Sequence, residues 1–299
     1  MRVAGIALTH PDRILYPGQG ITKLDLARFY EGISPRILPH VRDRPLSVVR
    51  CPRGAGQECF FQKHGHETFP EAVGFVDVKE KEGTSRYLMV DSAAGLVALV
   101  QMGVLELHPW GSRADRLEEP DRMFFDIDPA PDVPWERVVE ASLLLREFLS
   151  RLDLTAFVKT TGGKGLHVVV PLARKHGWDE VKTFSRAVAA AIARAEPKRY
   201  IATASKEQRK GRIFIDYLRN ARGATAVAAY STRARPGAPV STPIAWKELD
   251  SGVRSSSFDV RNLEQRLRKL RRDPWEDFEK LAQTLGARAK RELGLGRPL

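Results

Sequence analysis

The stretch MFFDIDPAP, residues 123–131, places two carboxylates inside a run that is otherwise apolar enough to form a core strand. In a strand, residues i and i+2 project from the same face. Phe125 and Ile127 are therefore predicted to face the core, while Asp126 and Asp128 project together from the opposite face. The proline that follows cannot donate a ladder hydrogen bond, so we expect the strand to end there, with both carboxylates at its rim.

Two carboxylates this close together repel each other unless a cation lies between them or one is protonated. Oxygen ligands without neighbouring thiols favour a hard cation such as Mg²⁺ or Mn²⁺. Asp216, near the end of the apolar run RIFIDYL at 212–218, is the best candidate for a third ligand. Three acidic groups that hold two metal ions are the usual scaffold for phosphoryl or nucleotidyl transfer. Similar patterns occur in glycosyltransferases and nucleases, and solvated turn residues at a strand end are the structural alternative.

The charge of the chain points to a polyanionic partner. Its 299 residues include 49 Lys and Arg against 37 Asp and Glu, a formal net charge of +12. Such an excess most often indicates nucleic acid, although a merely soluble basic protein has the same composition. No apolar run is long enough to span a bilayer and there is no secretory signal, so we expect a cytoplasmic protein without a membrane partner. Cys51 and Cys59 are the only cysteines, too few for a disulfide framework.

Strands and helices are both expected along the whole chain. Apolar runs bounded by turn residues predict strands at 46–50, 58–63, 73–78, 86–90, 122–128, 156–160, 166–171, 212–218 and 225–231. Apolar periodicity and capping residues predict helices that start at Thr22, a buried helix within 91–103, helices over 135–148 and 179–195, and a basic helical segment at 261–299. We therefore expect an α/β (α+β) fold with mixed and antiparallel sheets flanked by helices. Without repeats or a long linker, one domain over 1–299 is expected.

Several motifs, in this order and spacing, resemble those of one family. They are THPDRILYP (9–17), ITKLDLARFY (21–30), ECFFQKH (58–64), DSAAGL (91–96), LELHPW (105–110), FFDIDP (124–129), KTTGGKGLHVVVPL (159–172), RIFIDYLRN (212–220) and AAYSTRAR (228–235). The family is the polymerase domain of bacterial ATP-dependent DNA ligase D, which acts in non-homologous end joining and belongs to the archaeo-eukaryotic primase superfamily. The resemblance covers about residues 5–260.

The resemblance implies a primase-type catalytic core that adds nucleotides to DNA 3′ ends and fills short gaps. It further implies that manganese is favoured over magnesium and that ribonucleotides are preferred over deoxyribonucleotides. The implied partners are NTPs, broken or gapped DNA with a 5′-phosphate, ligase and phosphoesterase domains of the same polypeptide, and the Ku end-binding protein, in the cytoplasm and nucleoid of a bacterium.

On this resemblance, Asp126, Asp128 and Asp216 match the catalytic metal-binding triad. His108 matches a nucleotide-contacting histidine, and Arg233 an arginine on the nucleotide's phosphates.

The TGGKG loop resembles the family's triphosphate loop. Its glycines let backbone N–H groups converge on phosphate oxygens, while Thr161 adds a hydroxyl and Lys164 a charge. Without the neighbouring aspartates, an ordinary glycine-rich turn would be the better interpretation.

On the DNA side, Arg13 and Lys23 match the basic pair that receives the 5′-phosphate across a gap. A helix start between them, at Thr22, would add backbone N–H groups. By themselves the two residues would be interpreted as solvated.

Phe60 and Phe61 are adjacent in a predicted strand, so one is expected in the core and the other on a template base. Lys63, Arg50 and Arg53 are expected to contact the DNA backbone.

Other interpretations of the same residues remain open. A metal-dependent nuclease or phosphodiesterase would use the same carboxylates but would not need the TGGKG loop or Arg233. A non-catalytic DNA-binding module of a ligase would explain the charge and leave the three aspartates unexplained. A zinc site built from the cysteines with His64 and His66 is rejected, because the spacing matches no common zinc module.

Overall fold

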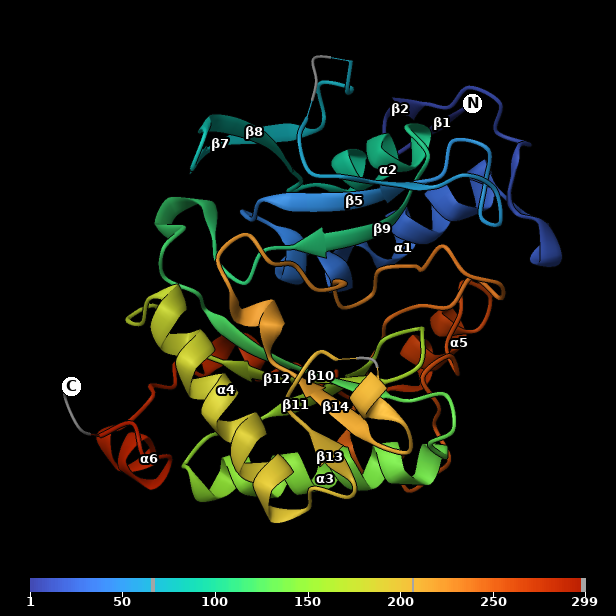
Figure 1. Cartoon of the computed structure of the whole chain (residues 1–299). Coiled ribbons are helices and arrows are strands. Elements are labelled where there is room, and N and C mark those ends of the chain that lie inside the picture. Colours follow the sequence, from blue (N-terminus) through green and yellow to red (C-terminus); the bar gives the residue numbers. More distant parts are fainter. Residues whose placement is uncertain (66–67, 206, 297–299) are drawn as a thin grey trace. The chain divides into compact units, whose positions relative to one another are not determined.

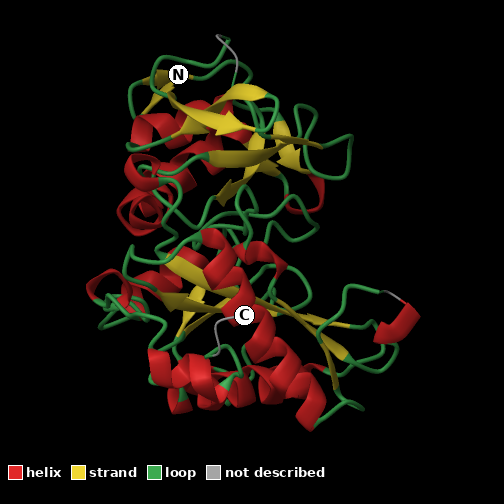
Figure 2. Ribbon diagram, turned by 60° about the vertical axis from the view of Figure 1, so that its left-hand side comes forward, coloured by secondary structure: helices red, strands yellow, loops and turns green. Residues whose placement is uncertain are grey.

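The computed structural model describes residues 1–65, 68–205 and 207–296. Close contacts divide the chain into two compact units. The first contains Met1–Asp115, Thr225–Thr242 and Ser256–Leu270, and the second contains Arg116–Ala224, Pro243–Ser255 and Arg271–Leu299. The chain thus passes back and forth between the units, and each unit is described by itself below (Figures 1 and 2).

The first unit is built on a sheet with strand order β6-β5-β8-β7, in which β9 also pairs with β5. The strands are β5 (Leu46–Arg50), β6 (Phe60–Gln62), β7 (Gly74–Glu80), β8 (Gly83–Met89) and β9 (Val104–Pro109), and short pairs precede them: β1 (Arg2–Val3) with β2 (Ile6–Ala7), and β3 (Ile14–Tyr16) with β4 (Ile21–Thr22). Helices α1 (Lys23–Val41) and α2 (Ala93–Gln101) pack against each other, and both contact β9. Helix α5 (Leu263–Lys269) belongs to the same unit.

Helix α1 begins where its capping residues predict. The Thr22 hydroxyl accepts a hydrogen bond from the Asp25 backbone N–H at 3.1 Å, and the Thr22 N–H donates to the Asp25 carboxylate at 2.9 Å. This reciprocal pair satisfies two N–H groups that the helix itself leaves without partners. The start of α1 is therefore set by local sequence.

The second unit is built on a mostly antiparallel sheet with strand order β13-β14-β10-β12-β11-β15. Its strands are β10 (Arg122–Pro129), β11 (Phe157–Thr160), β12 (Leu166–Pro171), β13 (Tyr200–Ile201), β14 (Ile213–Asp216) and β15 (Pro243–Ile244). Helices α3 (Trp135–Arg151) and α4 (Trp178–Ala195) both pack against β10, as Figure 1 shows. Their apolar sides cover Phe125 and Ile127, which are fully buried, so the other face of β10 carries the aspartates.

The expected mixed α/β fold is confirmed, but two segments differ from their predictions. Residues 225–231 form no strand; Thr225 makes an isolated bridge to Trp110, and the rest is irregular. Their consecutive apolar side chains, Ala226 to Tyr230, are nevertheless buried, which explains why the run resembles a buried strand. Over the described part of 261–299, α5, a short 3₁₀ turn at Phe278–Lys280 and α6 (Ala287–Glu292) are separated by loops.

The only two cysteines of the chain are bonded to each other. Cys51 and Cys59 form a disulfide that closes the loop between β5 and β6. Two cysteines are too few for a framework of several disulfides, and their number alone does not predict whether they form a single one. His66, considered above for zinc, lies outside the described residues. Within the described ranges, no helix has the length and apolarity needed to cross a membrane.

Candidate active site and nucleic-acid interface

Strand pairing in the second unit brings the three aspartates to one face of the sheet. In the antiparallel pairing of β10 with β14, Asp126 lies directly opposite Asp216, and Asp128 lies opposite Phe214. Residues opposite each other in such a pair project from the same face, as do residues two apart along a strand. Asp126, Asp128 and Asp216 therefore share one face of the sheet.

The three carboxylates differ in their electrostatics. Burial, and after it the charge of Asp126, raises the pKa of Asp216, although the hydrogen bond that the Leu218 N–H donates to its Oδ1 at 2.7 Å lowers it. Burial and Asp126 likewise raise the pKa of Asp128. Mutual repulsion of this kind is what a bound cation relieves.

Asp126 has the opposite shift because it lies among donors and cations. Burial alone raises its pKa, but His167, Arg219 and Lys159 outweigh burial and hold the pKa below its usual value. Burial and the Lys159 charge lower the pKa of His167 to about 4, although the neighbouring Asp126 carboxylate opposes this shift. His167 Nε2 lies 3.6 Å from an Asp126 oxygen, and among the described residues its buried Nδ1 has no hydrogen-bond partner.

Two arginines contact the same aspartates. Arg209, on the short 3₁₀ turn Glu207–Arg209 before β14, donates from Nη1 to Asp128 Oδ2 at 2.6 Å, and its guanidinium lies 4.3 Å from the Phe214 ring centre. Arg219 Nε lies 3.9 Å from Asp216 Oδ2. Sequence reasoning missed Arg209, since nothing in its local pattern marks it.

The donor set suits a hard cation, because all three side chains are carboxylates. Among the described residues, however, no group of three or more His, Cys, Asp or Glu side chains has the arrangement of a metal site. The contacts above explain this, because Asp128 and Asp216 direct an oxygen to other donors. The residues present fit divalent ions in type, and Arg209 competes with such ions for Asp128.

The TGGKG loop connects β11 to β12 beside these carboxylates. Thr161 is buried, and its hydroxyl donates to the Gly165 carbonyl at 2.9 Å and accepts from the Gly163 N–H at 3.2 Å, so it braces the loop from inside. A Cβ atom on Gly165 would lie 1.9 Å from the Ile127 carbonyl oxygen of β10. Only glycine permits this approach of the loop to the aspartate strand.

A cavity of about 670 Å³ adjoins the loop. It is lined by Asp128, Pro129, Ala130, Pro131, Asp132, Lys164, Arg209 and Lys210. Lys164 is exposed and its charge favours the ionised form of Asp128. The lining thus combines one metal-ligand candidate with three basic side chains, which suits a polyphosphate.

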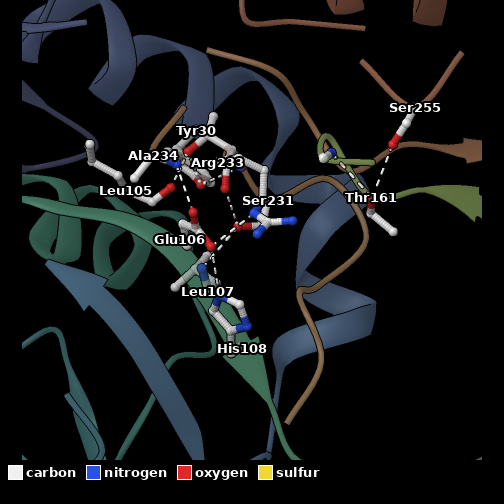
Figure 3. A network of polar contacts seen from close by, with 12 residues as sticks. Tyr30, Leu105, Glu106, Leu107, His108, Thr161, Ser231, Arg233, Ala234 and Ser255 are labelled. Carbon is white, nitrogen blue, oxygen red and sulfur yellow. Dashed lines mark hydrogen bonds and ion pairs between the residues drawn. The ribbon is translucent and has the colours of Figure 1, made fainter. Parts of the chain in front are cut away.

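His108 and Arg233, in the first unit, belong to one network around a buried carboxylate, Glu106 (Figure 3). His108 Nε2 lies 2.8 Å and Arg233 Nε 2.9 Å from the same oxygen, Glu106 Oε2. Both side chains are largely buried, at 14% and 15% exposure. Sequence reasoning missed Glu106, although the i, i+2 spacing of Glu106 and His108 in LELHPW was a usable signal.

The expected 5′-phosphate pair lies at the start of α1. Lys23 is buried, and its ammonium donates to the Thr9 carbonyl at 2.8 Å, with Gln101 Oε1 at 3.4 Å. Burial and the Arg13 charge lower the pKa of Lys23. Arg13 is exposed and donates to the Pro52 carbonyl at 3.2 Å. Lys23 is therefore not the solvated surface lysine that the alternative interpretation required.

Phe60 and Phe61 correct one expectation, because neither is in the core. Both are exposed, at 45% and 49%, since β6 is an edge strand of its sheet. Phe60 lies 5.4 Å from the Arg50 guanidinium, and Phe61 contacts the His108 ring edge to face with centres 5.7 Å apart. Exposed aromatic rings on an edge strand suit stacking on bases.

The three basic residues around this strand differ in how firmly they are held. Arg50 donates to the Met102 carbonyl and to Gln62 Oε1, each at 3.0 Å, and burial lowers its pKa. Lys63 is exposed, and Arg53 is exposed within 3.5 Å of Glu58. Arg50 is thus fixed in the fold, whereas Lys63 and Arg53 reach into solvent.

Known proteins resemble this chain over nearly its full length. Residues 22–275 match the family model "LigD, primase-polymerase domain". The multifunctional non-homologous end joining protein LigD of Pseudomonas aeruginosa is 45% identical over 294 residues, which are 98% of this chain and 35% of that protein. LigD of Mycolicibacterium smegmatis is 33% identical over 266 residues, 86% of this chain and 34% of that protein. This chain thus spans about a third of the length of these relatives.

A solved structure agrees in fold. The polymerase domain from Mycobacterium tuberculosis ligase D in complex with DNA superposes with a TM-score of 0.86 at 29% sequence identity. The match covers 93% of this chain and 99% of that one.

Proposed function

Because this chain belongs to the family of LigD primase-polymerase domains, we propose that it is a nucleotidyltransferase that adds nucleotides to DNA 3′ ends and fills short gaps in double-strand break repair by non-homologous end joining. The observation that carries the proposal is the pairing of β10 with β14. It brings Asp126 opposite Asp216, beside a glycine-rich loop that Gly165 holds against the same strand. A DNA-binding module has no use for this arrangement of carboxylates.

We propose that Asp126, Asp128 and Asp216 hold two divalent ions, with manganese favoured over magnesium. When bound, such ions neutralise charge on the triphosphate and make the attacking 3′-hydroxyl more acidic. Lys164 would place its charge on the same phosphates, while Thr161 keeps the loop in shape. Arg209 would leave Asp128 when the ions enter, since both compete for one carboxylate.

The incoming nucleotide is proposed to be an NTP, with a ribonucleotide preferred over a dNTP. We assign His108 to contact the nucleotide and Arg233 to its phosphates. Their common anchor on Glu106 supports a joint role.

For the DNA, Arg13 and Lys23 are proposed to bind the 5′-phosphate at the far side of a gap. The burial of Lys23 supports this role, because a partly desolvated ammonium interacts more strongly with an anion. Phe60 or Phe61 is proposed to stack on a template base, and Lys63, Arg50 and Arg53 to contact the backbone. The solved relative contains DNA, which supports a DNA substrate.

The chain is proposed to work beside ligase and phosphoesterase domains and with the Ku protein, in the cytoplasm and nucleoid of a bacterium. The relatives are named as multifunctional or bifunctional end-joining proteins, which supports further activities in a longer polypeptide.

A labelled primer on a gapped duplex with a 5′-phosphate, Mn²⁺ and each NTP tests the proposal. A lengthened primer supports a polymerase, a shortened primer a nuclease, and an unchanged primer in a shifted complex a binding module. Asp126→Asn should abolish extension without weakening DNA binding, whereas Asp250→Asn, which neutralises an exposed carboxylate of the same unit, should extend normally. Full activity of the Asp126 variant would refute the assignment of the metal site.

A further inference from the structure

Glu106 is a buried carboxylate to which the proposed function gives no task. It lies in β9 with 5% exposure, and Leu105 and Leu107 beside it are buried on the other face. An ionised carboxylate in such a place is costly unless hydrogen-bond donors surround it. Burial by itself raises the pKa of the Glu106 carboxyl, but the hydrogen bond from His108 and the Arg233 charge outweigh it and lower the pKa to about 2. The side chain is therefore an anion at neutral pH.

The two oxygens of Glu106 have different partners. Oε2 accepts from His108 Nε2 at 2.8 Å and from Arg233 Nε at 2.9 Å. Oε1 accepts from the Ala234 backbone N–H at 2.8 Å. One oxygen thus holds both side chains that are assigned to the nucleotide, although Arg233 lies 127 residues further along the chain.

The contact also sets the chemistry of the histidine. An ionised carboxylate can only accept hydrogen bonds, so the proton of this contact must be on His108 Nε2. On Arg233, the contact uses Nε, at the base of the guanidinium, which aligns the whole planar group. Glu106 therefore controls the ring tautomer of one residue and the direction of the other.

The backbone next to Arg233 is held in place by hydrogen bonds that do not involve Glu106 (Figure 3). The Ser231 hydroxyl accepts from the Leu107 N–H at 2.9 Å, and the Thr232 hydroxyl donates to the Leu105 carbonyl. The Thr232 N–H donates to the buried Tyr30 hydroxyl at 3.1 Å. These bonds join 231–232 to β9 and α1 without Glu106. Replacing the Glu106 carboxylate should thus free the two side chains and leave the chain path in place.

We propose that Glu106 is a positioning residue for the nucleotide, which orients His108 and Arg233 before the nucleotide binds. The inference rests on the proposed function, because it needs those two residues to contact the nucleotide. A carboxylate that orients two donors in advance lowers the ordering cost of binding, so its loss should appear in nucleotide affinity.

The test measures ATP affinity by calorimetry with Mn²⁺ and without DNA. Glu106→Gln keeps the shape and removes the charge, and it should weaken ATP binding about tenfold or more, because a charge-assisted contact is lost at each partner. Glu106→Asp keeps the charge and should recover part of the affinity. Glu31→Gln, on α1, is the matched control, since Glu31 accepts only a backbone hydrogen bond, from Ala4 at 2.8 Å, in the described contacts.

A weaker affinity for ATP could come from a less stable fold or from wrongly oriented His108 and Arg233 side chains, and a further variant separates the two causes. Leu99→Ala removes a buried side chain of α2 and should lower stability without altering ATP affinity. Weakened ATP binding in Leu99→Ala to the same extent would overturn the proposal, because it would mark a general effect of stability.

A double-mutant cycle with Arg233→Gln separates the positioning role of Glu106 from the proposed role of Arg233 in nucleotide binding. If Glu106 acts in part through Arg233, Glu106→Gln should weaken ATP binding less in the Arg233→Gln background than in the wild type, because only its effect through His108 remains. If Arg233→Gln leaves ATP affinity unchanged, the proposed role of Arg233 fails. If Arg233→Gln weakens binding but Glu106→Gln does not, or if the two effects add in full, the positioning role of Glu106 fails.

Discussion

The ionised Glu106 carboxylate should contribute to the stability of the fold, and this contribution should be lost as the pH falls from 4.5 toward 2. Its folded-state pKa, about 2, lies below the ordinary value of 4.5. A group with a depressed pKa contributes stability above its unfolded pKa and loses it as the pH falls toward its folded pKa. The difference of about 2.5 units corresponds to about 3 kcal/mol at 1.36 kcal/mol per unit. Since only 5% of the residue is exposed, solvent screening reduces this figure little.

Urea unfolding of the wild type and Glu106→Gln between pH 7 and pH 3 measures this contribution. The glutamine stays neutral throughout, and other carboxylates titrate in both proteins, so the difference in unfolding free energy isolates Glu106. The difference should change little between pH 7 and pH 5 and should be smaller by about 2 kcal/mol at pH 3 than at pH 7. A difference that remains constant down to pH 3 would refute the electrostatic account of Glu106.

Three further changes test other parts of the site. Lys23→Gln should reduce the preference for gaps with a 5′-phosphate over a 5′-hydroxyl by about tenfold, since one charge-assisted contact is lost; DNA-binding titrations with both ends measure it. Arg209→Gln should raise the Mn²⁺ affinity of the protein without DNA, because a competing cation leaves Asp128; electron paramagnetic resonance of free Mn²⁺ measures it. Gly165→Ala should destabilise the protein by more than about 2 kcal/mol, because its Cβ would overlap the Ile127 carbonyl; urea unfolding measures it.

Each of these changes has a result that speaks against its reasoning. An unaltered preference for phosphorylated ends in Lys23→Gln would assign the 5′-phosphate to other residues. Unchanged or weaker Mn²⁺ binding in Arg209→Gln would show that the arginine does not compete with the ions. Gly177→Ala has open space around its added Cβ and serves as the control for Gly165→Ala; equal stability of the two variants would contradict the close approach at Gly165.

Local pattern was enough for most of the elements and for the side of the strand on which the aspartates lie. The alternation in MFFDIDP correctly assigned Phe125 and Ile127 to the core and the two aspartates to the opposite face. The capping pair of Thr22 and Asp25 set the start of α1. Patterns failed where burial had a non-local cause, as at 225–231, where irregular backbone buries a run of consecutive apolar residues.

Contacts between residues far apart in the sequence, and the position of a strand in its sheet, could not be predicted from local patterns. Adjacent aromatics in a strand were expected to divide between core and surface, yet Phe60 and Phe61 are both exposed, because β6 lies at the edge of its sheet. Arg209 was missed because its partner Asp128 lies 81 residues away, and the contact of Glu106 with Arg233 likewise spans 127 residues. No local periodicity encodes such a pair.

Short segments of the chain were enough to predict the candidate metal-ligating carboxylates, the strand that carries Asp126 and Asp128, and the glycine loop beside them. The pairing of β14 with β10 in the register that sets Asp216 opposite Asp126, and the contacts of Glu106 with His108 and Arg233, are evident only in the folded chain. The difference arises because strand and helix geometry repeats every two or about four residues, so its pattern can be recognised in a short segment. The register between distant strands depends instead on the packing of the whole sheet.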